Sequence, residues 1–186
     1  MYERVKKIAE AASMMANVDY EMELISGIYE ILPNRFGAGI IQNNFELLGE
    51  IKYTDSEIDY ANTILKETGK ELKGLDGTIK PLRPTLPAQG GSTDVGDVSQ
   101  VVPVVRLRTT TAAKDGPWHS WAVVACTGMS IGHKGMIYAS KALAMTMLDL
   151  YKNPKLIDGV KKEFLVRKGD RVYVPQIPPG PPKLID

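Results

Sequence analysis

The sequence predicts an α/β protein in which helices flank a mixed sheet. Three segments carry this prediction. Residues 18–24 alternate apolar and acidic side chains, as in a strand with one wet face. Residues 121–128 form a short apolar run typical of a buried strand, and residues 134–152 are a long apolar stretch suited to a helix. Strands and helices that interleave along a chain are typical of α/β or mixed-sheet domains.

Three helices are predicted in the first third of the chain. Residues 2–16 carry apolar side chains at helical spacing. Asn34 can cap a helix over 35–48, because its side chain can accept a bond from a free backbone N–H of the first turn. Thr54 and Glu57 have the spacing of a capping box and predict a further helix ending near residue 68.

Irregular segments, strands and helices are predicted in turn along the middle and end of the chain. Residues 69–100 are rich in glycine and proline and predict a long irregular segment, a feature that is usually functional or disordered. A strand is expected over 101–110, followed by the 121–128 strand and the 134–152 helix. Pro154 suits the first position of a helix to about residue 167. A short strand over 171–175 precedes a proline-rich tail.

Composition excludes several classes of protein. The formal net charge of the 186 residues is +1, so neither nucleic acid nor an anionic membrane is an expected partner. No apolar stretch approaches the roughly 20 residues that a membrane span needs, and the first residues lack the apolar core of a signal peptide. The single Cys126 excludes an internal disulfide. We therefore expect a soluble, cytoplasmic protein.

The chain has two histidines, His119 and His133, fourteen residues apart. Each could be a structural or loop histidine, and each could be a metal ligand, since neutral imidazole is a common ligand. Gly132 and Gly135 leave room near His133 for a ligand or for another backbone. A metal site needs three or four protein ligands, and no complete zinc signature is present. On spacing alone, any metal site here is partial.

A second candidate site is the stretch GGSTDVGDVS, residues 90–99, which combines glycines with hydroxyl and carboxylate side chains. Such a stretch can bind an anion or orient a substrate, or it can be a connection built from side-chain turns. It lacks the ending of a Walker loop and the spaced oxygens of an EF-hand. Its candidate residues are Ser92, Thr93, Asp94 and Asp97.

Three motifs resemble a known family. GGSTDVGDVSQVVP, WHSWAVVACTGMSIGHKGM and ASKALAMTMLDLY are similar to the C-terminal part of amidohydrolases related to p-aminobenzoyl-glutamate hydrolase. These enzymes belong to the dinuclear metallopeptidase superfamily of carboxypeptidase G and aminoacylase. The start of the chain, AASMMANVDYEMELISGIYEILPNR, resembles the end of that family's lid domain. The resemblance therefore covers essentially the whole chain.

The resemblance implies a fold, a metal centre and a reaction. Residues 1–32 would be the end of an α/β lid or dimerisation domain, and residues 33–186 the C-terminal half of a zinc-peptidase-like catalytic domain. Two divalent ions, zinc or manganese, would activate a water molecule in the intact enzyme. His133 matches the family's last metal ligand. His119 and Ser120 match a motif that lines the substrate side of the cleft, and Asp94 matches a residue that shapes the site.

The family's remaining ligands and its general base lie in an N-terminal half that has no counterpart in these residues. We therefore expect a metal-dependent hydrolase of N-acyl or N-aroyl amino acids or small peptides that works with a missing half or a second chain. The intact form is expected to be a homodimer. The alternative is a non-catalytic assembly or regulatory module derived from such an enzyme.

Overall fold

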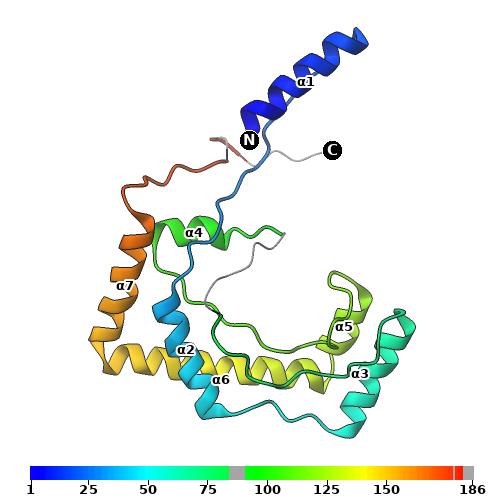
Figure 1. The fold of residues 1–186 in the computed structure, drawn as a ribbon, viewed down its shortest axis with the longest axis vertical. Helices are drawn as coiled ribbons and strands as arrows, with labels where there is room; N and C mark the ends of the chain where they lie inside the picture. The colour runs from blue at the N-terminus through cyan, green and yellow to red at the C-terminus, as the bar shows by residue number, and fades with distance from the viewer. Residues whose placement is uncertain (84–90, 178, 182–186) are drawn as a thin grey trace.

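The computed structural model describes residues 1–83, 91–177 and 179–181, and within these ranges it contains seven helices and no strand (Figure 1). The predicted α/β fold with a mixed sheet is therefore wrong for this chain. The helices are α1 (Tyr2–Ala16), α2 (Arg35–Leu48), α3 (Asp55–Glu67), α4 (Val95–Val101), α5 (Trp121–Thr127), α6 (Ser130–Lys152) and α7 (Pro154–Lys168).

The helices with clear start signals are confirmed. The Asn34 side chain accepts a hydrogen bond from the Gly37 N–H at 2.8 Å and so caps α2. At the start of α3, Thr54 and Glu57 form both bonds of the capping box. Pro154 occupies the first turn of α7. In each case a short-range signal fixes the helix start, because the bonding groups lie within one turn of each other.

The predicted strands are absent for two different reasons. Residues 18–24 and 171–175 are extended, but no described segment forms a ladder with them. Alternating apolar and polar residues indicate which face of a strand meets water. A strand also needs a neighbouring strand to hydrogen-bond its backbone N–H and C=O groups, and the alternation does not show whether one is present. The 121–128 run is instead the helix α5, whose first turn Ser120 caps. Short apolar runs fit a buried strand and a buried helix equally well.

Two further boundaries differ from the prediction. The 101–110 stretch continues α4 at its first residue and then runs without regular structure. The helix α4 lies inside the segment predicted to be irregular, of which residues 84–90 are outside the described residues. Helix α6 begins at Ser130, so His133 lies in its first turn instead of before it.

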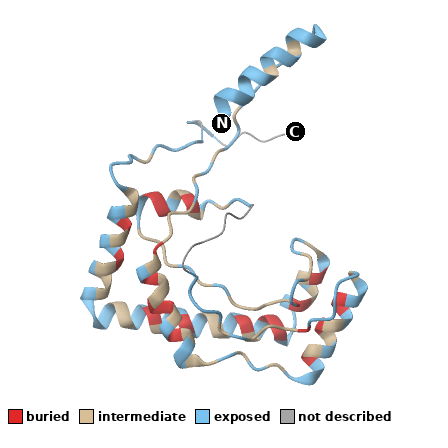
Figure 2. Ribbon diagram, in the orientation of Figure 1, coloured by how far each residue is buried: buried red, intermediate tan, exposed pale blue. Residues whose placement is uncertain are grey.

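Helix α6 is the centre of the packed region. It contacts α2, α5 and α7, while α2 also packs on α7 and α3 on α5. Figure 2 shows the buried residues along these contacts. A polar contact fixes α2 on α6, because the buried Asn44 amide donates to Thr146 at 3.1 Å and to Asp149 at 2.8 Å. The main apolar cluster joins α3, α5 and the start of α6 through Ala61, Ile64, Leu65, Ala122, Cys126 and Ile131.

The chain exposes an unusually large surface. Helix α1 buries none of its residues and projects away from the other helices at the end of an extended segment (Figures 1 and 2). The total accessible surface is 13550 Å² for a 20.4 kDa chain. A folded monomer of this mass is expected to expose about 8,800 Å². The apolar faces of α1 and of part of α6 therefore remain uncovered, and the proposed division at residue 32 stays a prediction.

Burial along α6 leads to a mutational prediction. Leu143 belongs to the apolar stretch of α6, but its side chain is 44% exposed, whereas Ile131 on the same helix is 1% exposed. We expect Ile131→Ala to lower the free energy of unfolding by about 2–5 kcal/mol and Leu143→Ala to lower it by less than about 1 kcal/mol. Urea denaturation of both variants measures the difference. Equal losses would contradict the position of α6 in this fold.

Candidate functional site

The residues on either side of His133 hold α6 against its neighbours. Gly132 lies against the backbone of Thr127 at the end of α5, and an added Cβ would overlap the Thr127 carbonyl. A Cβ at Gly135 would likewise overlap the carbonyl of Thr110. The sequence predicted room beside these glycines for a ligand or for another backbone segment. In the structure, other backbone segments occupy it.

Ser130 and Lys134 bind the buried carboxylate of Glu57, which belongs to the capping box of α3. Ser130 donates to Glu57 Oε1 at 2.6 Å, and Lys134 Nζ lies 2.6 Å from Oε2. Burial alone would raise the pKa of this carboxyl, but hydrogen bonds from Lys134, Ser130 and the Thr54 N–H outweigh burial and lower the pKa to about 2. Burial, reinforced by the Glu57 charge, raises the pKa of the adjacent Tyr53 to about 12. This charged cluster joins α3 to α6.

Among residues 130–135, His133 is the residue whose side chain makes no packing or polar contact that stabilises the fold. Its side chain is exposed and makes no hydrogen bond or ion pair with the described residues, while its N–H continues the helix by donating to Met129. Its neighbours Gly132, Lys134 and Gly135 all have structural contacts. The His133 imidazole is therefore available to bind a group from outside the described chain.

His119 and Ser120 have different roles. Ser120 caps α5 by accepting from the Ala122 N–H at 3.3 Å, and its hydroxyl donates to the Pro117 carbonyl at 2.6 Å. His119 is exposed, has no side-chain partner among the described residues, and adopts a left-handed backbone with φ of 56°. Such a conformation is strained for a residue with a side chain and is often found at functional sites. Sequence patterns give no signal for this strain.

The Asp97 side chain joins α4 to two extended segments of the chain. Its carboxylate accepts hydrogen bonds from the Tyr29 N–H at 3.2 Å and from the Tyr173 hydroxyl at 3.1 Å, so it fastens two extended segments to α4. In the same helix Ser99 accepts from the Leu32 N–H, and Gln100 donates to the Glu30 carbonyl. These bonds explain why α4 forms despite its glycine and polar residues.

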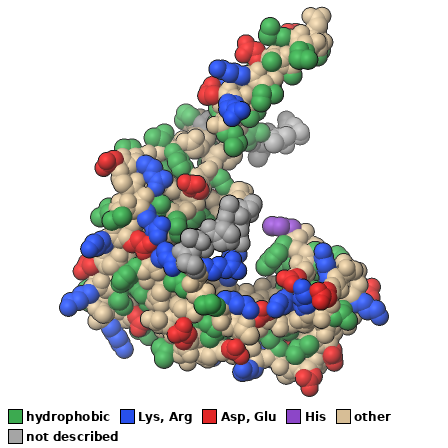
Figure 3. Space-filling model, in the orientation of Figure 1, with side chains coloured by type: hydrophobic (Ala, Val, Ile, Leu, Met, Phe, Trp, Pro, Cys, Tyr) green, Lys and Arg blue, Asp and Glu red, His purple; other side chains and the backbone are tan. Residues whose placement is uncertain are grey.

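The other predicted residues of the 90–99 stretch lie at the start of α4. Thr93 accepts a bond from the Val95 N–H, and Ser92 and Asp94 are exposed. No hydrogen bond or ion pair among the described residues joins them to His119 or His133. Figure 1 places α4 and α5 on opposite sides of the molecule's concave face. Figure 3 shows the hollow between them, with Lys and Arg side chains at its base and a histidine at its edge.

The described residues do not form a metal centre by themselves. No group of three or more His, Cys, Asp or Glu side chains in this part of the chain is arranged to hold an ion. The two predicted metal ions therefore do not fit these residues alone, and each exposed imidazole could provide at most one ligand. No helix in the described ranges is long and apolar enough to cross a membrane.

Comparison with known proteins finds two distant relatives. The chain is 28% identical over 188 residues to one of the subunits of p-aminobenzoyl-glutamate hydrolase from Escherichia coli K12; the match covers 88% of this chain and 39% of that protein. It is 37% identical over 79 residues to the Xaa-Arg dipeptidase of Mus musculus, covering 42% of this chain and 18% of the dipeptidase. No family model matches the chain, and no solved structure matches it significantly.

Both relatives are named as hydrolytic enzymes, which indicates a distant relationship to hydrolases of the amidohydrolase and peptidase type. The name of the bacterial relative also describes it as one subunit of an enzyme. The chain spans about two fifths or less of the length of these relatives.

Proposed function

We propose that this chain is part of a metal-dependent hydrolase that cleaves the amide bond of N-acyl or N-aroyl amino acids or of small peptides. The observation that carries the proposal is the exposure of the two histidine side chains. Both imidazoles are exposed and unpartnered among the described residues, while the residues around them are engaged in packing and capping. The similarity to two hydrolases supplies the reaction class.

In this proposal the chain contributes one ligand to a two-metal site, and His133 is that ligand. Zinc or manganese bound there would activate water for attack on the amide carbonyl. The other ligands and the general base come from residues beyond this sequence, either in the same protein or in a second chain. His119 lies just before α5, and its left-handed backbone makes it the competing candidate for the ligand.

An assembly or regulatory module is the second candidate function. The observation that favours it is the exposed surface, which exceeds the expectation for a monomer by roughly half. Obligate interfaces bury about 2,000–5,000 Å² in total and are rich in apolar residues. A partner chain or a second copy would cover such a surface in either function.

Metal analysis and activity assays of matched variants test the proposal. The chain alone is expected to retain almost no zinc or manganese after dialysis. In enzyme reconstituted with its remaining part, His133→Ala is expected to lower turnover more than about 100-fold and to release one metal. Lys141→Ala, an exposed change on the same helix, is the control and should leave both unchanged.

The outcome for His119 separates the alternatives. If His119→Ala removes the metal and His133→Ala does not, the ligand is His119. Normal metal content and turnover in both variants would contradict any ligand role for this chain and would favour the assembly module.

A further inference from the structure

Residues 104–111 follow α4 as an extended segment that rests on α2 and α6 (Figure 1). Val105 lies against α2, because an added Cβ at Gly37 would overlap the Val105 side chain. Thr109 donates its hydroxyl to the Gly135 carbonyl of α6 at 3.2 Å. The odd-numbered side chains of this segment therefore face the helices.

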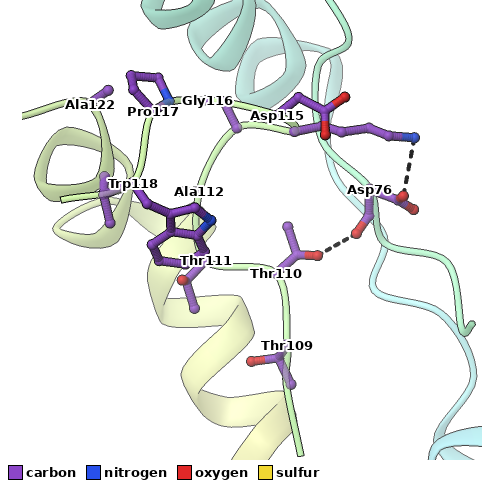
Figure 4. Close-up of a pocket in the computed structure, with 13 residues that line it drawn as sticks. Asp76, Thr109, Thr110, Thr111, Ala112, Asp115, Gly116, Pro117, Trp118 and Ala122 are labelled. Carbon is purple, nitrogen blue, oxygen red and sulfur yellow. Dashed lines mark hydrogen bonds and ion pairs between the residues drawn. The ribbon is translucent and has the colours of Figure 1, made fainter. Parts of the chain in front are cut away.

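The even-numbered side chains lie on the opposite side of the segment. Figure 4 shows this alternation near the end of the segment, where Thr109 and Thr111 point toward α6. Thr110 points away from α6 and donates its hydroxyl to the Asp76 carbonyl. Successive side chains of an extended chain point to opposite sides, so Arg106 lies on the same side as Thr110. The Arg106 side chain is exposed and has no partner among the described residues.

The backbone of residues 104–107 lacks a hydrogen-bonded neighbour. None of its N–H or C=O groups bonds to a described residue. Such groups need partners from water or from another strand, and an unpaired edge can accept a strand of another chain. This edge carries Val105 and Leu107 on the side of the helices and Arg106 on the outer side.

Residues 18–24 have the complementary pattern. Asp19 and Glu21 alternate with apolar side chains, and both acidic side chains are exposed and unpaired among the described residues. The apolar side chains of the segment are largely exposed as well. Paired with residues 104–107, this segment places its apolar side chains on the side of the helices and its carboxylates beside Arg106. A shift by one residue would reverse both faces, so the pattern permits one match of faces.

The partner segment comes from a second chain. Figure 1 shows residues 18–24 leading away from the packed helices toward α1. The bonds from the Tyr29 N–H to Asp97 and from the Leu32 N–H to Ser99 fix where this arm leaves α4.

The exposed surface supports the same conclusion. The accessible surface exceeds the expectation for a monomer by roughly half. That surplus is several times the area of about 800 Å² that each partner buries in a stable complex.

We propose that residues 18–24 of a second copy of this chain add as a β-strand to residues 104–107, with Asp19 and Glu21 beside Arg106. Each chain carries both halves of the contact, so a two-fold dimer contains it twice. The proposal involves neither metal nor catalysis, and it does not rest on the proposed hydrolase activity.

Sedimentation velocity of the full chain and of charge-reversal variants tests the pairing. The unmodified chain is expected to form dimers that weaken as salt is added. Glu21→Lys and Arg106→Glu should each weaken dimerisation at least about tenfold, because each change sets like charges together at both contacts. Asp158→Lys and Lys161→Glu make the same changes of charge on the exposed side of α7, and they should leave dimerisation unchanged.

A mixture of the two arm and edge variants is the sharpest test. When Glu21→Lys and Arg106→Glu chains are combined in equal amounts, both contacts of the mixed dimer again join opposite charges. The mixed dimer should therefore form about as readily as the unmodified one. Hydrogen exchange gives a second readout, since the N–H groups of residues 104–107 should be protected in the dimer and exchange freely in either variant alone.

Three results would overturn the proposal: an unmodified chain that is monomeric at every concentration, a dimer that neither reversal weakens, or a mixture that stays monomeric. Protection of residues 104–107 in a monomer would mean that the arm folds back on its own chain, and it would overturn the assignment to a second copy.

Discussion

Replacing Lys134 by methionine is expected to lower the free energy of unfolding by roughly 2–4 kcal/mol. The Glu57 carboxylate is buried, and Lys134 supplies one of its three hydrogen-bond donors and its closest positive charge. Removing one partner of a buried ion pair leaves an uncompensated charge, which costs far more than the loss of a surface pair. Methionine keeps most of the apolar stem, so urea denaturation of this variant measures chiefly the loss of the charge.

A surface pair in the same region provides the control. Lys52 lies 3.1 Å from Glu50, but both side chains are largely exposed. Exposed pairs contribute about 0–1 kcal/mol, so Lys52→Met should change the unfolding free energy by less than about 1 kcal/mol. Equal effects of Lys52→Met and Lys134→Met would show that Glu57 is hydrated in the folded chain.

The same cluster predicts a dependence of stability on pH. The folded pKa of Glu57 is about 2, below the value of 4.5 of a free side chain. A depressed pKa contributes stability that is present above the unfolded pKa and is lost as pH falls toward the folded pKa. For Glu57 this contribution is on the order of 3 kcal/mol and should disappear between about pH 4.5 and pH 2.

Loss of the Lys134 donor raises the folded pKa of Glu57 back toward its ordinary value, so the contribution of Glu57 in this pH range should shrink. Glu57→Gln should remove it altogether. Urea denaturation at several pH values gives, for each variant, the slope of the unfolding free energy against pH. Identical slopes in the unmodified chain and in Glu57→Gln would assign the acid sensitivity to other carboxylates.

Local signals in the sequence were sufficient for the helices α2, α3 and α7. The Asn34 cap, the Thr54–Glu57 capping box and Pro154 all act within one helical turn. Each can therefore be recognised from a few consecutive residues. The strands failed because pairing is not local: residues 18–24 have the right alternation and no partner in the described chain. Helix α4 was missed for the same reason, since distant backbone groups near Tyr29 stabilise it.

The candidate site was predictable only in part. Sequence reasoning found both histidines and the glycines beside His133, but it could not decide between ligand and structural roles. The structure assigns Ser120 to a helix cap and Asp97 to a connection between segments, while leaving the two imidazoles exposed. The left-handed backbone of His119 is a conformation that no short motif encodes.

Gly132→Ala is expected to destabilise the chain by about 3 kcal/mol, although alanine is normally the better helix former. The added methyl group would overlap the Thr127 carbonyl and lie 2.6 Å from the Thr127 Cα, and backbone atoms cannot rotate away as a side chain can. Overpacking of this kind costs about 1–3 kcal/mol or more. Gly39 in α2 is the matched control, because nothing lies within 4 Å of its added Cβ. Gly39→Ala should stabilise by about 0.5–1 kcal/mol.

The opposite signs of these two changes bear on function as well as on stability. Gly132 fixes the contact between the end of α5 and the start of α6. His133 follows Gly132 in α6, so this contact sets the position of the His133 imidazole relative to α5. A shift between the helices should therefore reduce metal retention and turnover of the reconstituted enzyme, while Gly39→Ala leaves both unchanged. Full activity in a Gly132→Ala enzyme that unfolds at a lower urea concentration would mean that the position of His133 relative to α5 does not matter for the proposed metal site.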